Sequence, residues 1–265
     1  MLEAVIFDWA GTLSDFGSRA PLSAFVTLFA NHGVDISLAE AREPMGTEKK
    51  EHIRRLLRMP RIRTAWRAVH GADASEGDID SLYGELVPIQ REAIERHSQL
   101  VPGATDTLRM LRSLSIKIGS TTGYGRAMVG PMLQRAAEQG FTPDCVVTAD
   151  EVPLARPAPA GALKNAIELG VGDVGHCLKV DDTQPGIEEG LHAGMWTAAV
   201  VVSGNAVGLS LEEWQQLPPE QQQRLRQRAY QVADAYGAHF TIDSVADLPA
   251  VVMEINRRVV LGERP

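Results

Sequence analysis

The feature that most constrains the fold is a short apolar run, ending in a polar residue, that recurs along the chain. "LEAVIFD" lies at the start, and the same form returns in "IKIGSTTG", "CVVTAD", "CLKVDD" and "WTAAVVVSG", each followed by a loop or a helical stretch. Near-continuous apolar strands that alternate with helices are typical of a parallel sheet covered on both faces. The sequence therefore predicts an α/β fold in which the polar strand ends meet at one edge of the sheet.

A long segment without strand character interrupts this pattern. Residues 18–99, between the first two apolar runs, have helical periodicity and no convincing strand. Pro60 is expected to end one helix and begin another, and Pro88 to break or kink a helix. We therefore predict a Rossmann-like core made of residues 1–17 and 100–265, with residues 18–99 inserted as a helical cap. The tail predicts a helix, a short strand at "HFTI" and a closing helix.

The composition is that of a folded, acidic protein. Hydrophobic residues make up 44% of the 265 residues, and the formal net charge is −8, which argues against nucleic acid or an anionic membrane as the main partner. Cys145 and Cys177 each lie in an apolar run, so we expect free buried thiols rather than a disulfide. No apolar stretch approaches membrane-spanning length and no secretion signal is recognisable, so we expect a cytoplasmic protein.

Polar residues at the strand ends predict a phosphoryl-transfer site. Asp8 follows the first apolar run, and its carboxylate could attack phosphorus to form an acyl phosphate. Thr122 and the amide of Gly123 follow the second run, where they could hold phosphoryl oxygens at a helix N-terminus. Arg156 lies in a proline-bounded loop after the third run and could bind the same oxygens with two N–H groups. Taken singly, each residue has a structural alternative, such as an ordinary turn or cap.

The pair Asp181 and Asp182, after the fourth run, predicts a Mg²⁺ site. A hard cation prefers oxygen ligands, and we expect it to take them from Asp8, from the backbone carbonyl of Ala10 and from Asp182, the better placed of the pair. A backbone ligand at position 10 explains how that position contributes without a functional side chain. The structural alternative is that one of the two carboxylates only caps the next helix.

One lysine of the cap is expected on an apolar helix face. If a helix covers "EPMGTEKKEHIRR", one of its faces holds Met45, Lys49, His52, Ile53 and Leu56. Lys50 turns about 100° away from Lys49. Because desolvation disfavours an ammonium, a lysine on the apolar face could be partly neutral near pH 7 and could attack a carbonyl. A solvated basic face is the structural alternative.

Together these motifs resemble the phosphonatase family of the haloacid dehalogenase superfamily. The resemblance rests on "AVIFDWAGT", on "PMG" with a lysine three residues later and a histidine beyond it, and on "KIGSTTGY", "DEVPLARP", "AGMWT" and "GAHFTI". It implies a Rossmann-like core with a helical cap, Mg²⁺, a homodimer, and hydrolysis of phosphonoacetaldehyde to acetaldehyde and phosphate. It further implies Asp8 as nucleophile, Lys49 as the Schiff-base former, and substrate contacts from Thr122, Gly123, Arg156, Met45, His52 and Tyr124.

Two positions depart from the pattern common in phosphatases of that superfamily. Ala10 stands where they carry a second Asp that protonates the leaving alcohol, and Gly186 stands where an Asp commonly follows the metal ligand. Asp181, Glu188 or Glu189 could replace the latter through water. The missing acid at position 10 weighs against the main alternative, a phosphatase of small phosphate esters. A haloacid dehalogenase, which would need neither Mg²⁺ nor a cap amine, and an inactive phosphate-binding module are further alternatives.

Overall fold

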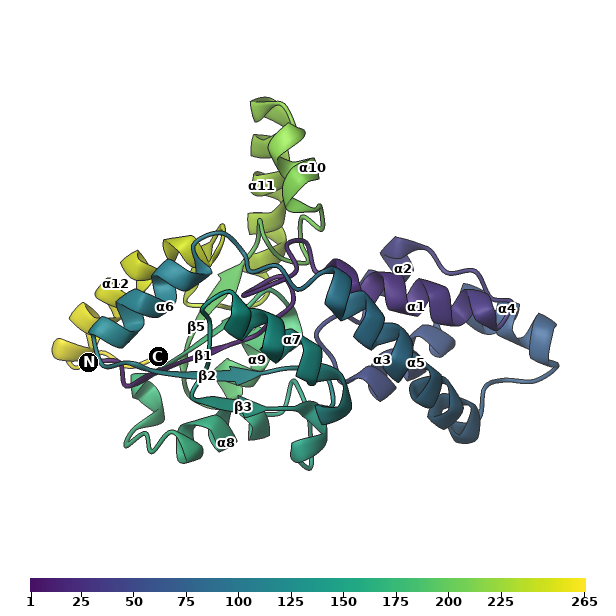
Figure 1. Cartoon of the computed structure of the whole chain (residues 1–265), viewed down its shortest axis with the longest axis horizontal. Coiled ribbons are helices and arrows are strands. Elements are labelled where there is room, and N and C mark those ends of the chain that lie inside the picture. The colour runs from purple at the N-terminus through teal and green to yellow at the C-terminus, as the bar shows by residue number, and fades with distance from the viewer.

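The computed structural model describes all 265 residues, and its centre is one sheet of six strands (Figure 1). The strands are β1 (Ala4–Phe7), β2 (Lys117–Thr121), β3 (Cys145–Val147), β4 (Cys177–Asp181), β5 (Trp196–Val200) and β6 (Phe240–Ile242). Their order is β3-β2-β1-β4-β5-β6, and every neighbouring pair is parallel. The apolar runs and "HFTI" form these strands, which confirms the predicted α/β fold.

Helices cover both faces of the sheet. They are α6 (Ala104–Ser113), α7 (Arg126–Glu138), α8 (Ala160–Glu168), α9 (Gln184–His192) and α12 (Leu248–Val260), with short helical turns at Ala149–Glu151, Val174–His176 and Val245–Asp247. In β1, Val5 and Phe7 pack in the largest apolar cluster with side chains of α6, α7 and α12, whereas Ala4 and Ile6 pack in a second cluster with α8. The alternation explains why β1 is apolar at every position.

Five helices lie between β1 and α6, on the right in Figure 1. They are α1 (Arg19–Asn31), α2 (Leu38–Arg42), α3 (Lys49–Arg58), α4 (Pro60–His70) and α5 (Glu76–Arg96). They occupy the segment that we propose as the cap. Pro60 begins α4 as expected, but the break expected at Pro88 does not occur. Helix α5 continues through Pro88, since residues on both sides of it are buried and α5 packs along α1, α3 and α7.

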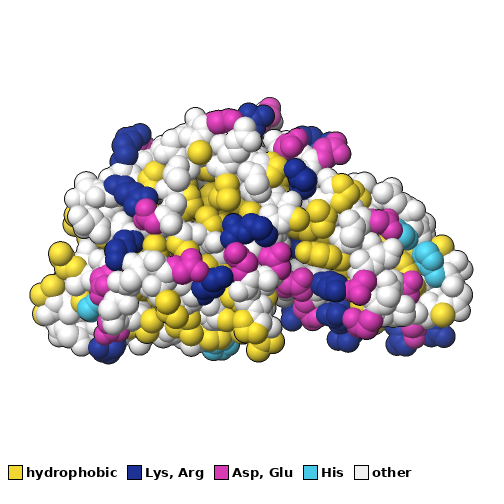
Figure 2. Space-filling model, turned by 60° about the horizontal axis from the view of Figure 1, so that its bottom comes forward, with side chains coloured by type: hydrophobic (Ala, Val, Ile, Leu, Met, Phe, Trp, Pro, Cys, Tyr) yellow, Lys and Arg dark blue, Asp and Glu magenta, His cyan; other side chains and the backbone are white.

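The tail has the predicted strand and closing helix, but the stretch expected to form one helix before the strand forms two. Helices α10 (Leu211–Gln216) and α11 (Pro219–Asp234) extend away from the sheet in Figure 1 and pack together through Trp214, Ala229 and Ala233. Both cysteines are free and buried, as predicted. None of the helices has the length and apolar character needed to cross a membrane. Acidic and basic side chains are interspersed over the face drawn in Figure 2.

The register of the sheet sets the position of the polar strand ends. Phe7 is level with Ser120 of β2 and with Val180 of β4. The residues that follow these three positions therefore leave the sheet at the same edge. This edge faces the helices α1–α5 across the loops that follow β1, β2 and β4.

Candidate active site

A small cavity lies where the helices α1–α5 meet the carboxyl edge of the sheet. Its volume is about 20 Å³, room for about one water molecule. The lining residues are Asp8, Ala10, Ser18, Pro21, Met45, Gly46, Lys49, Thr122, Gly123, Tyr124, Arg156, Asp182 and Thr183. Except for His52, every residue predicted for the site contributes to this lining.

Asp8 is held at the end of β1, next to the base of the cavity. Its backbone N–H donates to the carbonyl oxygen of Val180 at 2.9 Å, which continues the sheet pairing by one residue. Its side chain Oδ1 accepts a hydrogen bond from Nη1 of Arg156 at 2.7 Å. Burial, and after it the charge of Asp181, raises the pKa of Asp8 to about 6. The carboxylate is thus ionised at neutral pH, positioned by a guanidinium and shielded from bulk water.

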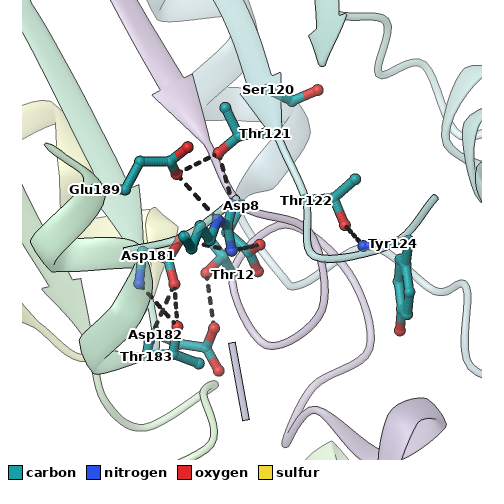
Figure 3. A network of polar contacts seen from close by, with 12 residues as sticks. Asp8, Thr12, Ser120, Thr121, Thr122, Tyr124, Asp181, Asp182, Thr183 and Glu189 are labelled. Atoms are coloured by element: carbon teal, nitrogen blue, oxygen red, sulfur yellow. Dashed lines mark hydrogen bonds and ion pairs between the residues drawn. The ribbon is translucent and has the colours of Figure 1, made fainter. Parts of the chain in front are cut away.

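Arg156 is buried, although it was predicted in a loop of the kind that usually exposes arginines. Its side chain is 4% exposed and contacts four residues, all of which are labelled in Figure 3. Nε donates to Glu189 at 3.0 Å, Nη2 to the hydroxyl of Thr121 at 2.6 Å, and Nη1 lies 3.3 Å from Asp181 as well as against Asp8. The guanidinium therefore lies between the candidate nucleophile and a second layer of polar side chains.

Three carboxylates form a cluster that fits a divalent cation. One oxygen each from Asp8, Asp181 and Asp182 lies within 4.8 Å of the others, and all three residues are buried. Asp181 is already paired with Lys179 at 2.8 Å and with the Thr183 hydroxyl at 2.8 Å. Burial, together with the charges of Asp8 and Asp181, raises the pKa of Asp182 well above its ordinary value. No basic side chain forms an ion pair with Asp182, and a hard cation beside Asp8 would balance its negative charge.

The glycine at position 186 is explained by the neighbouring carboxylate. A Cβ at Gly186 would lie 2.0 Å from the Asp181 side chain, so no larger residue fits while Asp181 holds its present place. Of the three residues considered as substitutes for the missing acid, only Asp181 belongs to the cluster. Glu188 accepts a hydrogen bond from Gln184, and Glu189 is bound in the layer behind Arg156.

Lys49 brings an amine from α3 into the same cavity. It is the first residue of α3 and is 4% exposed. Its Nζ lies 4.8 Å from the ring centre of Tyr124 and 5.7 Å from that of Phe25. Burial lowers the pKa of Lys49 to about 8, and the partial positive charge of a helix N-terminus also disfavours an ammonium there. Lys50 points away and pairs with Asp80, as its predicted position about 100° around the helix from Lys49 indicates.

With one exception, the other predicted residues line the same cavity as the amine. Met45 precedes α3, so it lines the cavity from a turn rather than from the helix face on which it was expected. Thr122 accepts a hydrogen bond from the backbone N–H of Tyr124 at 3.1 Å. His52 lies outside the cavity lining: its ring stacks on Phe25 at 3.8 Å and its Nε2 contacts the backbone oxygen of Ala41 at 2.9 Å. It packs inside the cap behind Lys49, and a direct substrate contact is therefore not supported.

Sequence reasoning missed the polar layer behind Arg156 and one contact between α2 and the loop after β5. The layer consists of Thr121, Lys179 and Glu189. Lys179 carried a recognisable clue, because it is a charged residue in the middle of an apolar strand. The contact is made by Arg42 of α2, whose Nη1 donates to the backbone oxygen of Asn205 at 2.8 Å and to its side chain at 2.7 Å. No local pattern in the sequence indicates it.

Comparison with known proteins identifies the family. Residues 2–194 match the model of the haloacid dehalogenase-like hydrolases. The chain is 55% identical over its whole length to the phosphonoacetaldehyde hydrolase of Hahella chejuensis, covering 90% of that protein, and 48% identical to that of Pseudomonas aeruginosa, covering 96%. A phosphonoacetaldehyde hydrolase-like protein from Oleispira antarctica has a crystal structure that superposes with a TM-score of 0.98, at 52% identity over 100% of this chain and 96% of that one. The chain is therefore an enzyme of the phosphonoacetaldehyde hydrolase family, within the haloacid dehalogenase-like hydrolases.

Proposed function

We propose that the protein hydrolyses the P–C bond of phosphonoacetaldehyde to acetaldehyde and phosphate, through a Schiff base on Lys49 and an aspartyl phosphate on Asp8. The observation that carries the proposal is the buried amine of Lys49, which lines the same cavity as the carboxylate of Asp8. Ala10 offers no side-chain acid in that cavity. An ester phosphatase needs such an acid to protonate its leaving alcohol, whereas a P–C hydrolase needs a group that stabilises the carbanion formed when the P–C bond breaks.

The amine solves the problem of the carbon leaving group. Neutral Lys49 adds to the aldehyde carbon, and loss of water gives a protonated imine. The carboxylate of Asp8 then attacks phosphorus. The P–C bond breaks, and its electron pair moves into the carbon skeleton to neutralise the iminium nitrogen, leaving an enamine. Water hydrolyses the aspartyl phosphate, and protonation and hydrolysis of the enamine release acetaldehyde and restore the lysine.

The residues around these two groups have distinct tasks in the proposal. Thr122, the amide of Gly123 and Arg156 hold the phosphonyl oxygens. Met45 and Tyr124 surround the amine and exclude water from it. Mg²⁺, held by Asp8, Asp182 and the Ala10 carbonyl with Asp181 nearby, would supply electrostatic stabilisation of the phosphoryl group.

The size of the cavity supports an enzyme that opens and closes. A space for about one water molecule cannot admit phosphonoacetaldehyde. We propose that α3, which carries Lys49, moves away from the sheet before substrate enters and returns before the amine reacts. We also retain a cytoplasmic homodimer as part of the proposal; sedimentation at several protein concentrations tests the oligomeric state.

Trapping of the imine tests the proposal directly. Borohydride added with acetaldehyde should inactivate the enzyme and leave a reduced adduct on the peptide that contains Lys49. Lys49→Arg keeps the charge but cannot form the imine, so it should lose both adduct and phosphate release, while the matched variant Lys50→Arg should lose neither. An adduct on Lys50, full activity of Lys49→Arg, or faster phosphate release from a panel of phosphate esters than from phosphonoacetaldehyde would each contradict the proposal.

A further inference from the structure

A buried polar layer lies behind Arg156 and has no task in the reaction described above. It consists of Thr121 at the end of β2, Lys179 in β4 and Glu189 in α9. Thr121 and Glu189 are labelled in Figure 3. The three residues are between 0% and 3% exposed. None of them lines the cavity. Burying two charged side chains and a hydroxyl costs free energy unless each has hydrogen-bond or ion-pair partners. We therefore expect each of the three residues to be held by specific contacts.

The hydroxyl of Thr121 uses all its hydrogen-bonding capacity within the layer. It donates to Glu189 Oε2 at 2.9 Å, and it accepts from Lys179 Nζ at 2.9 Å and from Arg156 Nη2 at 2.6 Å. A hydroxyl has one donor and two acceptor sites. The two cations occupy both acceptor sites, so the proton must point at Glu189. The orientation of the whole group is thereby fixed.

Glu189 and Lys179 complete the support of the guanidinium. Glu189 Oε2 accepts from Arg156 Nε at 3.0 Å and lies 3.4 Å from Lys179 Nζ, which keeps the carboxylate from turning away. Gly161 of α8 leaves the space for this carboxylate, because a Cβ there would lie 2.5 Å from Glu189 Oε1. Nε and Nη2 of Arg156 are thus held from behind, and Nη1 is directed at Asp8.

We propose that Thr121, Glu189 and Lys179 are positioning residues that hold Arg156 in the orientation in which it meets the phosphoryl group. The inference rests on the proposed function, in which Arg156 binds phosphoryl oxygens. An arginine side chain has many rotamers, and one that is already held loses little freedom when the anion arrives. The layer therefore acts on recognition of the anion, and it leaves the amine chemistry of Lys49 untouched.

Thr121→Val tests the inference, with Thr121→Ser as its matched control. Valine preserves the shape of threonine and removes the hydroxyl, whereas serine keeps it. Calorimetric titration with inorganic phosphate should show affinity weakened by about tenfold or more in Thr121→Val, as expected when a charged group loses a hydrogen-bond partner, and near-normal affinity in Thr121→Ser. With phosphonoacetaldehyde, the same variant should show a raised KM. Imine trapping at Lys49 with acetaldehyde should proceed at the wild-type rate.

A second variant, Gly161→Ala, tests the inference independently in case Thr121→Val does not fold. Gly161→Ala changes no charge, and alanine favours a helix, but its Cβ displaces the Glu189 carboxylate. It should also weaken phosphate binding about tenfold. Gly130→Ala in α7, where a Cβ meets nothing within 4 Å, is the matched control and should bind phosphate normally.

The outcomes separate this inference from the proposed function. Phosphate affinity that is unchanged in folded Thr121→Val or Gly161→Ala overturns the inference, as does phosphate binding by Arg156→Ala as tight as that of the wild type, or a wild type that binds no phosphate. Equal loss of phosphate binding and imine trapping indicates a general structural defect and also overturns it. Failure to cleave phosphonoacetaldehyde, with phosphate binding dependent on Thr121, overturns the reaction and leaves the positioning role standing.

Discussion

Replacing Lys49 with methionine should stabilise the folded protein, and the burial of the amine sets the size of the effect. Burial lowers the pKa of Lys49 from 10.5 to about 8, which corresponds to about 3 kcal/mol against folding while the lysine is protonated in both states. Cation–π contacts with the faces of Tyr124 and Phe25 stabilise the protonated amine by about 1 kcal/mol. Methionine has a similar length and no charge to desolvate. Lys49→Met should therefore gain about 2 kcal/mol near pH 7 and lose P–C cleavage.

The gain should depend on pH in a defined direction. Below pH 8 the amine is protonated in the folded protein and in the unfolded chain, so the cost of burying the charge is fully present. Between about pH 8 and 10.5 the folded protein releases the proton while the unfolded chain keeps it. The wild type therefore becomes more stable relative to Lys49→Met across this range, and the difference caused by the charge disappears near pH 10.5.

Urea unfolding followed by circular dichroism, at about pH 7 and about pH 9.5, measures the free energy of unfolding under both conditions. Lys50→Met is the matched control, because the Lys50 side chain is 39% exposed and paired with Asp80, and its replacement should change the free energy of unfolding by no more than about 0.5 kcal/mol. The reasoning is refuted if Lys49→Met is no more stable than the wild type near pH 7, or if its advantage is equally large at both pH values.

Four further changes should each affect one part of the site. Asp8→Asn should abolish phosphate release without altering the circular dichroism spectrum, once deamidation is excluded by mass. Asp182→Ala should move the Mg²⁺ activation curve to higher concentrations, and an unchanged curve would place the metal elsewhere. Arg42→Ala removes hydrogen bonds between cap and core, and kcat/KM should fall by about tenfold, while the exposed cap variant Arg58→Ala should match the wild type. Ala10→Asp should slow borohydride trapping of the cap amine near pH 7, and an undiminished rate would contradict a charge effect at that position.

The sheet could be predicted from the sequence because its central strands β1, β4 and β5 are buried on both faces. A strand of that kind is mostly apolar, and its polar ending marks the edge at which it leaves the sheet. Lys179 in β4 is an exception. The continuous course of α5 through Pro88 could not be predicted, since the local rule for proline favours a break and only packing against α1, α3 and α7 opposes it.

The residues of the candidate site also fall into those that could be predicted from the sequence and those that could not. Asp8, Thr122 and Asp182 were predictable because each follows a strand, and the order of the strands brings them together. Thr121 and Glu189 were not predictable, because their contacts join β2 to α9 and depend on the register of the sheet and the packing of a helix on it. Helical periodicity placed Lys49 and His52 on one face correctly, but a helix face covers both a cavity and the packed interior, and periodicity does not separate the two.

The absence of an acidic side chain at position 10 and the presence of the amine at position 49 are physically linked. Ala10 and Lys49 line the same small cavity, which already contains the carboxylates of Asp8 and Asp182. A further carboxylate at position 10 would favour the charged form of the nearby amine, raising the pKa of Lys49 from about 8 back toward 10.5 and reducing the neutral fraction that can attack an aldehyde. It would also add a negative charge beside two acids whose pKa values burial already raises. A carboxylic acid at position 10 would help an alcohol to leave, but it would also keep the Lys49 amine protonated and unable to form the imine. A site that depends on neutral Lys49 therefore has a physical reason to lack an acid at position 10.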